Sequence, residues 1–505
     1  MEPKKRIVVN TLAQHIRSIV NICLSLYSTR LVLEALGKSD YGTYSLVAGV
    51  VALLGFITNA LVVTTQRQVS FYHGKGDIQA VRQVFSTSLV LHFVLAVVVG
   101  VALAAIAPLL FNGFLHLESG REDAARIVYY LVILSLIITF LTAPYRGLFI
   151  ARENIVYISI IDVCDGVLKL LMALFLLHYH ADRLVAYAVM MTSIVAFNWL
   201  ALVGWSLKHF EESTVIPHRK DISKAAMAEL TSFAGWTIYS IGCIAGRNQG
   251  VAIVFNQFFG TIINAAYGIA NQVSGSVMFL ASALMNGISP QLIKAEGRGD
   301  RSMMLRFAEA ESKYALLLLS MAVIPLAFEM PSILELWLGD VPQHSVTLCR
   351  FILLTSLCDQ TTIGLGTANQ AIGRIRNYSL TVNTIKVLTL PAIWICLSLG
   401  YSVTAAMICY LSIELLCAMI RLPFLKYTAG LSIRHFANHV FIRAALPLAL
   451  QAAVCWLVCI VLDFPGRFLL TGVCSVAVGI GSVWLFGLEP DERIKALEIV
   501  RREKQ

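Results

Sequence analysis

The sequence predicts an all-α membrane protein with about fourteen transmembrane helices. Two parallel six-helix repeats are expected to form two lobes around a central cavity, followed by two C-terminal helices. Three observations lead to this prediction. The 505 residues are 58% hydrophobic and only 14% charged, against about 25% charge in soluble domains. Apolar runs of about twenty residues, the length that crosses a bilayer as a helix, recur along the chain. Residues 41–77 also align with residues 264–300 without a gap.

Helices are favoured over a membrane barrel because barrel strands alternate apolar and polar residues, whereas residues 90–107 (VLHFVLAVVVGVALAAIA) are almost uniformly apolar. The first apolar stretch follows a basic start, MEPKKRIVVN, but contains Gln14, Arg17 and Asn21 and has no small-residue cleavage site. It therefore predicts a retained first span and not a signal peptide. The expected spans are 8–34, 41–63, 84–111, 127–149, 155–178, 184–207, 231–256, 262–286, 314–337, 350–370, 378–399, 402–422, 440–462 and 467–487.

The repeat defines the expected domains. The aligned segments end in Gly74-Lys75-Gly76-Asp77 and Gly297-Arg298-Gly299-Asp300. A hydrophobic chain that repeats itself over several spans is typical of two-lobed transporters. We expect an N-terminal lobe over 1–223, a C-terminal lobe over 224–439, two added helices over 440–487 and a cytoplasmic tail over 488–505.

The distribution of Lys and Arg predicts the orientation. With a cytoplasmic N-terminus, basic residues concentrate in the segments that would face the cytoplasm, as the positive-inside rule requires. The outer segments hold Lys38, Arg121, Arg126, Arg183 and Arg467. Both termini are therefore expected in the cytoplasm, and the repeats are parallel because six is an even number. The net charge of +9 is explained by anchoring beside anionic lipids, and nucleic acid is not expected as a partner.

Apart from basic residues near the ends of the expected spans, five fall inside them, where each costs about 2.5–3.5 kcal/mol at the bilayer centre. They are Arg17, Arg30, Lys169, Arg247 and Lys386. We expect most of them to face a wet cavity or to pair with one another. In the first span Asn10, Gln14, Arg17 and Asn21 are spaced four, three and four residues apart, which puts them on one helical stripe. The stripe predicts a cavity lining; the alternative is a set of interhelical hydrogen bonds.

Four carboxylates inside spans are candidates for ion coupling. Asp162 and Asp165 lie two turns and one turn before Lys169, so a structural ion pair is the alternative. Asp359 and Glu414 are expected either to bind a coupling cation or proton or to pair with Lys386, and the sequence does not decide between these. The chain has eleven cysteines without a CxxC or Cys/His cluster, so no metal site is expected.

A cavity lined by Arg, Asn and aromatic residues suits an anionic, hydroxyl-rich substrate, because Arg makes bidentate contacts to phosphate and amides suit sugar hydroxyls. Four segments of the sequence also carry a family resemblance. The opening NTLAQHIRSIVNICLSLYSTRLVLEALGKSDYGTYSLVAGV, the turn QVSFYHGKGD, the segment PYRGLFIARENI and the segment ISPQLIKAEGRGD resemble bacterial polysaccharide flippases. These form the O-antigen and capsule branch of the multidrug/oligosaccharidyl-lipid/polysaccharide exporter superfamily. The resemblance covers residues 7–430.

The resemblance implies a flippase that moves an undecaprenyl-pyrophosphate-linked oligosaccharide from the cytoplasmic to the outer leaflet by alternating access, for surface polysaccharide assembly. It implies a bacterial inner-membrane location, possible contact with polymerase machinery, and coupling to Na⁺ or H⁺ with no other cofactor. The family's cationic cavity corresponds to Arg17, Arg30 and Arg247, with Lys169 and Lys386 as further candidates. A monomer is expected, because each pair of lobes makes its own cavity.

Three alternatives remain. The two extra spans also resemble those of the lipid II flippase. A multidrug exporter of the same superfamily would favour cationic drugs and use carboxylates, which the basic residues argue against. A glycan polymerase or ligase would need a catalytic outer loop, and the largest expected outer loop, 112–126, has no acid/base constellation. An enzyme is therefore not expected.

Overall fold

The computed structural model describes residues 3–52, 54–111, 121–338, 341–490 and 492–494. Among these residues the regular structure is helical and none lies in a strand, so the prediction of an all-α fold is confirmed. The chain divides into two compact units. We call Val8–Ile238 the N-terminal unit, and Tyr239–Gln505 together with Met1–Ile7 the C-terminal unit. The division falls inside a helix, 15 residues after the predicted boundary at 223.

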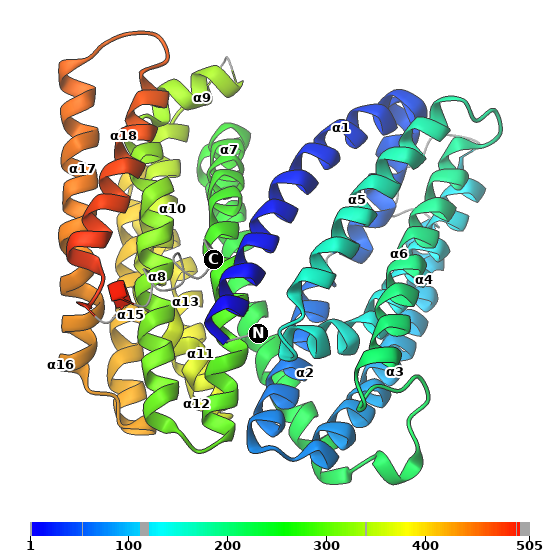
Figure 1. Ribbon diagram of the computed structural model, residues 1–505. Coiled ribbons are helices and arrows are strands. Elements are labelled where there is room, and N and C mark those ends of the chain that lie inside the picture. Colours follow the sequence, from blue (N-terminus) through cyan, green and yellow to red (C-terminus); the bar gives the residue numbers. More distant parts are fainter. Residues whose placement is uncertain (1–2, 53, 112–120, 339–340, 491, 495–505) are drawn as a thin grey trace, which may run out of the picture. The chain divides into compact units, whose positions relative to one another are not determined.

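The N-terminal unit is a helical bundle centred on α4. Its helix α4 packs against α2, α3 and α6, while α5 packs against α6. Its interior includes fully buried Leu61, Tyr129 and Phe140. The elements are α1 (Pro3–Ala52, which begins outside this unit), α2 (Gly55–Lys75), α3 (Ile78–Leu109), α4 (Glu122–Ala151), α5 (Ile155–Leu177), α6 (Arg183–His209), η2 (Arg219–Asp221) and the start of α7 (Lys224–Gly297) (Figure 1).

The C-terminal unit is centred on α8, which packs against α10, α11, α17 and α18. Its largest buried cluster joins α7, α8, α10 and α15. The elements after α7 are α8 (Arg301–Phe328), α9 (Met330–Leu338), α10 (Ser345–Gln360), α11 (Ile363–Ile372), α12 (Ile375–Tyr378), η3 (Ser379–Asn383), α13 (Thr384–Val387), α14 (Thr389–Ser398), α15 (Val403–Ala429), α16 (Ile433–Phe436), η4 (Ala437–Ile442), α17 (Arg443–Val461), α18 (Arg467–Ser482) and η5 (Val483–Gly487).

The two helices that the sequence marks as an addition, α17 and α18, dock on α8 and the turn that follows it. The Arg467 guanidinium donates to Glu329 with Nε to Oε1 at 2.9 Å, and the Thr471 hydroxyl donates to the same oxygen at 2.7 Å. Figure 1 shows α17 and α18 running side by side, in orange and red. Polar contacts of this kind fix helix pairs in a bilayer, where no hydrophobic effect drives helices together.

The repeated turn has the same geometry in both units. Gly76 and Gly299 adopt left-handed backbone angles, φ 76° and φ 80°, which favour glycine. The next residues cap the following helices: Asp77 accepts from the Ala80 amide and Asp300 from the Met303 amide, both at 2.9 Å. The Met303 amide lowers the pKa of Asp300 below its ordinary value of 3.8. The sequence repeat is therefore also a structural repeat at this turn.

Ten helical stretches of the described residues are long and apolar enough to cross a membrane. Each overlaps one of the predicted spans. The other four predicted spans are 41–63, 155–178, 231–256 and 350–370. Charged residues interrupt them, as Asp162, Asp165 and Lys169 do in α5, or a helix end divides them, as between α10 and α11. Together with the bundle architecture, the ten stretches define a multi-pass membrane protein.

Several predicted boundaries differ from the structure. The predicted gap at 257–261 lies inside α7, and the predicted second span is divided, since α1 ends at Ala52 and α2 begins at Gly55. The expected first loop is reduced to a kink at Gly37, with φ 73° inside α1. Hydropathy marks apolar runs, whereas helices continue into polar residues until a cap ends them. Most of the predicted outer loop 112–126 and of the tail 488–505 lies outside the described residues.

Candidate functional site

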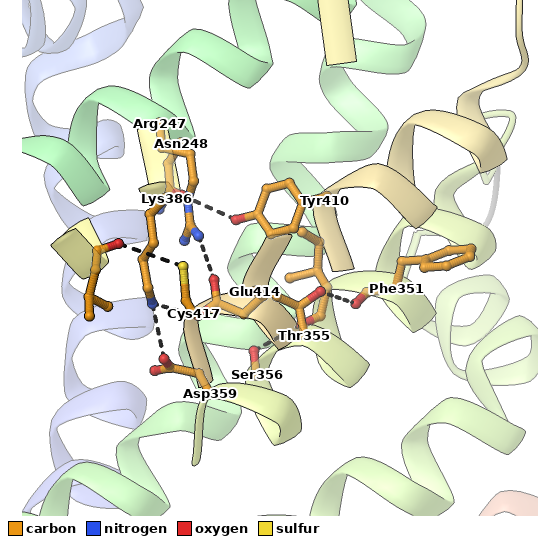
Figure 2. Close-up of polar contacts among 12 residues, drawn as sticks. Arg247, Asn248, Phe351, Thr355, Ser356, Asp359, Lys386, Tyr410, Glu414 and Cys417 are labelled. Carbon is orange, nitrogen blue, oxygen red and sulfur yellow. Dashed lines mark hydrogen bonds and ion pairs between the residues drawn. The ribbon is translucent and has the colours of Figure 1, made fainter. Parts of the chain in front are cut away.

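The C-terminal unit holds a buried group of five charged side chains, which we call the C-terminal network: Arg247, Asp359, Lys386, Glu414 and Arg421. The ammonium of Lys386 lies 2.5 Å from Glu414 Oε1 and 3.0 Å from Asp359 Oδ1. Arg247 Nη1 is 2.7 Å from Glu414 Oε2, and Arg421 Nη2 is 2.7 Å from Asp359 Oδ1. Figure 2 shows Lys386 between the two carboxylates.

Four helices supply this network. Arg247 lies on α7, Asp359 on α10 and Lys386 on α13, and α15 supplies Glu414 with Arg421. The last two are seven residues apart and so share one helical face. Lys386 follows the π-helical turn η3 (Ser379–Asn383); such turns are frequent at functional sites. The face of Arg247 also lies over the Tyr410 ring, 4.8 Å from its centroid.

Burial separates four of the five side chains of this network from solvent. The Glu414 side chain is 1% exposed and the three basic side chains are at most 9% exposed, whereas Asp359 is 23% exposed. Both carboxylates pair with Lys386, the alternative that the sequence left open beside cation or proton binding. Burial of charges is tolerated where each is paired and hydrogen-bonded. The role of Arg247 and Lys386 as residues that contact the substrate stays a prediction.

The N-terminal unit holds a second group, which we call the N-terminal network: Arg17, Arg146, Asp162, Asp165 and Lys169. Asp162 on α5 accepts from Arg17 of α1 at 2.7 Å and from Arg146 of α4 at 2.7 and 3.1 Å. One turn along α5, Asp165 pairs with Lys169 at 2.7 Å and accepts from the Asn198 amide of α6 at 2.7 Å.

The N-terminal network is more accessible than the C-terminal one. Its side chains are between 19% exposed, at Asp165, and 38% exposed, at Lys169. Each network contains three basic and two acidic side chains. Both therefore carry a formal charge of +1. All five side chains of the N-terminal network are about one fifth exposed or more, whereas in the C-terminal network only Asp359, at 23%, is as accessible.

The polar stripe of α1 faces α5 and the turn before it. The Asn10 amide donates to the Glu153 carbonyl at 2.8 Å, and Arg17 reaches Asp162. Asn21 lies against Gly166, where a Cβ atom would come within 2.9 Å of the Asn21 Oδ1. Gln14 is buried, 3% exposed, and its carbonyl accepts from Ser18. The predicted shared face exists, and its contacts include the interhelical hydrogen bonds that were the alternative to a cavity lining.

A cavity of about 300 Å³ lies in the N-terminal unit between α1, α5 and α6. Three of the predicted site residues line it: Asn21, Asp165 and Lys169. Arg30 is exposed on α1 and lies outside both networks. In the part of the chain that the structure describes, no group of three or more His, Cys, Asp or Glu side chains is placed to hold a metal ion.

Sequence reasoning missed three charged residues. Arg146 and Arg421 fall near the ends of the predicted spans 127–149 and 402–422, where basic residues are expected to face the cytoplasm, but both belong to the networks. Glu311 was placed before the ninth span, yet it is fully buried on α8. Its Oε1 accepts from Ser289 and Thr367 at 3.2 and 3.1 Å, and its Oε2 has no hydrogen-bond partner among the described residues. The sequence signal that could have identified these residues is the helical spacing of side chains, which continues to the end of each apolar run and beyond it.

The fold and these two networks define a helical membrane protein of two units with charged side chains inside each unit. No protein-family model matches the sequence, and comparison with curated proteins finds no match. Solved structures do share the fold. A MATE in the bent conformation aligns with a TM-score of 0.74 at 14% identity, over 87% of this chain and 97% of that chain.

Two further structures align over 85% of this chain and 96% of their own. A MOP superfamily transporter from Pyrococcus furiosus, described as having a binding pocket of reverse polarity that suggests a different function, gives a TM-score of 0.72 at 14% identity. A multidrug resistance MATE family transporter of the MOP superfamily, in the outward-facing conformation, gives 0.70 at 15%. The chain therefore has the MATE transporter fold, and at these identities the likeness concerns the fold alone.

Proposed function

We propose that this protein is a membrane transporter, not an enzyme, that exports an organic substrate by alternating access. The observation that carries the proposal is the fold, which is shared over 85–87% of the chain with MATE transporters. Charged side chains inside membrane helices support it, because such residues are expensive and commonly mark substrate or ion pathways. Alternating access fits two six-span repeats, which move as units in transporters of this kind.

Multidrug export is the first candidate. One of the solved structures with this fold is described as a multidrug resistance transporter, which supports this candidate more directly than any other. The carboxylates of the N-terminal network, which are about one fifth exposed, offer partners for a cationic substrate. Both are paired with basic side chains in this conformation, so such a substrate would compete with Arg17, Arg146 or Lys169.

Lipid-linked oligosaccharide flipping is the second candidate, and a specific observation favours it. Arg17 and Arg146 converge on the one carboxylate of Asp162, which leaves guanidinium donors in excess. Guanidinium groups suit the oxygens of a pyrophosphate. The description of the Pyrococcus furiosus transporter mentions a pocket of reverse polarity, and this supports the view that the fold accommodates substrates of either charge.

The remaining proposals concern the setting. We place the protein in the bacterial cytoplasmic membrane as a monomer with both termini in the cytoplasm, in contact with membrane lipids. Coupling to Na⁺ or H⁺ would use Asp162, Asp165, Asp359 or Glu414. Because each of these carboxylates is paired with a basic residue, a coupling ion would have to displace or share that partner.

Charge reversal in proteoliposomes separates the two candidates. Wild-type protein, Arg17→Glu and the exposed-site control Arg219→Ala are each given ethidium and a pyrophosphate-linked lipid oligosaccharide. A multidrug exporter moves ethidium and keeps that activity in Arg17→Glu, because a carboxylate is added. A flippase moves the lipid oligosaccharide and loses that activity in Arg17→Glu. If the wild-type protein moves neither substrate, both candidates fail.

A further inference from the structure

The N-terminal unit has a second cavity, which is apolar. It has a volume of about 430 Å³ and lies between α3, α4, α6 and the segment 210–223, which joins α6 to α7 and which we call the linker. Its lining includes Leu89 and Phe93 of α3, Leu141 of α4, Trp199 of α6 and linker residues 215–217, and none of the lining side chains is charged. The volume is within the range of known ligand sites. A lining of this kind suits a hydrocarbon chain, because apolar surface is removed from water on both partners.

Hydrogen bonds hold the linker in place as one wall of this cavity. The Tyr145 hydroxyl of α4 donates to the Thr214 carbonyl at 2.7 Å, directly before the linker residues that line the cavity. After them, the Ser223 amide donates to Thr87 Oγ1 of α3 at 3.2 Å. Residues 215–217 are therefore held between two anchored points, and the cavity is formed before a ligand enters it.

Exposed apolar side chains surround the cavity. Phe93 on α3 is exposed, and so are Val215 and Ile216 on the linker, with Ile216 as much as 79% exposed. Helix α3 is also one of the helices that are long and apolar enough to cross a membrane. Exposed apolar surface of this kind marks contact with a membrane or another apolar partner. A lipid chain can therefore reach the cavity from the bilayer without crossing a charged surface.

Arg82 lies on the same side of α3 as the cavity. It precedes Leu89 and Phe93 by seven and eleven residues, and both spacings return to one side of a helix. The helical rise places Arg82 about 10 Å from Leu89 along the axis, toward the start of α3. The Arg82 side chain is 50% exposed. This order of a charged group and then an apolar cavity matches a phospholipid, in which a charged headgroup lies beyond the acyl chains.

The linker brings a second basic side chain close to Arg82. Asp221 Oδ2 lies 3.7 Å from Arg82 Nε, and Lys220 is the neighbour of Asp221 in the short turn η2. Arg82 and Lys220 are both exposed, and Asp221 balances only one of their two charges. A phosphate would share the Arg82 guanidinium with Asp221 and pair with the Lys220 ammonium. The surface beside the cavity therefore suits an anionic headgroup.

We propose that this cavity is a binding site for an anionic phospholipid of the cytoplasmic leaflet. One acyl chain lies in the apolar cavity, and the phosphate lies beside Arg82 and Lys220. The leaflet follows from the orientation proposed above, in which α6 ends and α7 begins on the cytoplasmic side. The lipid is a partner and not a transported substrate. Because the linker joins the two repeats, the bound lipid contacts the segment that connects them.

The test measures lipid binding to the full-length protein in detergent by native mass spectrometry. The probes are dioleoyl phosphatidylglycerol, which is anionic, and dioleoyl phosphatidylcholine, which has the same acyl chains and no net charge. Val90→Trp fills the cavity, since Val90 lines it, and its matched control is Val97→Trp at an exposed position of the same helix. Lys220→Gln removes a headgroup contact, and its control is Lys426→Gln, an exposed lysine of α15 in the C-terminal unit.

We expect the first phosphatidylglycerol to bind about tenfold more tightly than phosphatidylcholine to the wild-type protein. Val90→Trp should weaken phosphatidylglycerol binding about tenfold, because the indole occupies the space of the acyl chain, whereas Val97→Trp should leave it unchanged. Lys220→Gln should reduce the preference for phosphatidylglycerol about fivefold, and Lys426→Gln should not change it. Lys220 is exposed, so this variant tests the proposal even if Val90→Trp fails to fold.

Equal binding of the two lipids by the wild-type protein would overturn the proposal. So would undiminished phosphatidylglycerol binding by folded Val90→Trp, or an unchanged preference in Lys220→Gln. Undecaprenyl phosphate serves as a competitor: if an equal amount displaces phosphatidylglycerol, the cavity holds the tail of a polyisoprenyl lipid and the proposal is wrong. None of these results depends on transport, so the proposal and the proposed function can fail separately.

Discussion

The two units accommodate charged side chains inside their helix bundles in different ways. Each places three basic and two acidic side chains inside its helix bundle. In the C-terminal network Glu414 is 1% exposed and bridges Arg247 and Lys386, whereas in the N-terminal network Asp162 is 20% exposed. Glu414 therefore acts as a buried link between helices, with Asp359 (23% exposed) at the accessible edge of its network, whereas every side chain of the N-terminal network is accessible to a ligand.

The largest expected effect is the loss of a carboxylate from the C-terminal network. Glu414→Gln leaves Arg247 and Lys386 buried with one carboxylate fewer, and removing one partner of a buried pair costs about 3–5 kcal/mol. We expect a large drop in the unfolding temperature in detergent, or failure to accumulate in the membrane. The control is Glu335→Gln at an exposed position of α9. A change no larger than that of the control would show that the network does not hold the helices.

The next largest expected effect is the loss of stability when a glycine at a close contact between helices is replaced by alanine in each unit. A Cβ atom at Gly364 would overlap the carbonyl oxygen of Ala308, so α11 and α8 would have to separate. Gly364→Ala should cost about 1–3 kcal/mol or more. Gly147→Ala, whose Cβ would lie 2.9 Å from the Val62 carbonyl oxygen, should cost less because its overlap is smaller.

The same thermal measurement tests this order, with Gly204→Ala as the control because nothing lies within 4 Å of its Cβ position. Equal unfolding temperatures for Gly364→Ala and Gly204→Ala would contradict the close approach of α11 to α8.

The smallest expected effect on stability is at the N-terminal network. Asp162→Asn removes the partner of Arg17 and Arg146, but both guanidinium groups are more than one fifth exposed and stay hydrated. The cost should be about 1 kcal/mol or less. The informative comparison is between the stability lost by Asp162→Asn and that lost by Glu414→Gln. If Asp162→Asn loses as much stability as Glu414→Gln, both networks have a structural role.

The sequence predicts those features that local spacing determines. The GKGD and GRGD turns predict equivalent positions, and the structure gives them the same glycine conformation and the same aspartate cap. The spacing of Asn10, Gln14, Arg17 and Asn21 predicts one face of α1. It does not predict that α5 covers this face, because that depends on contacts between residues about 145 positions apart.

Helix ends explain the remaining differences. Arg146 and Arg421 lie near the ends of the predicted spans 127–149 and 402–422, and Glu311 lies just before the span 314–337, although all three are inside the helices α4, α15 and α8. A polar residue at the end of a span has the same local sequence whether it faces water or a buried carboxylate. The partner that distinguishes these cases lies on another helix, and a single sequence does not contain it.

Transport per folded molecule by Arg17→Ala tests the account most directly. Wild-type protein, Arg17→Ala and Arg219→Ala are reconstituted in equal folded amounts and assayed with the pyrophosphate-linked lipid oligosaccharide. We expect Arg17→Ala to keep its unfolding temperature within a few degrees, because Arg146 still pairs with Asp162, and to lose about tenfold or more in transport rate, while Arg219→Ala transports normally. Undiminished transport by Arg17→Ala would contradict the claim that the N-terminal network is the accessible site.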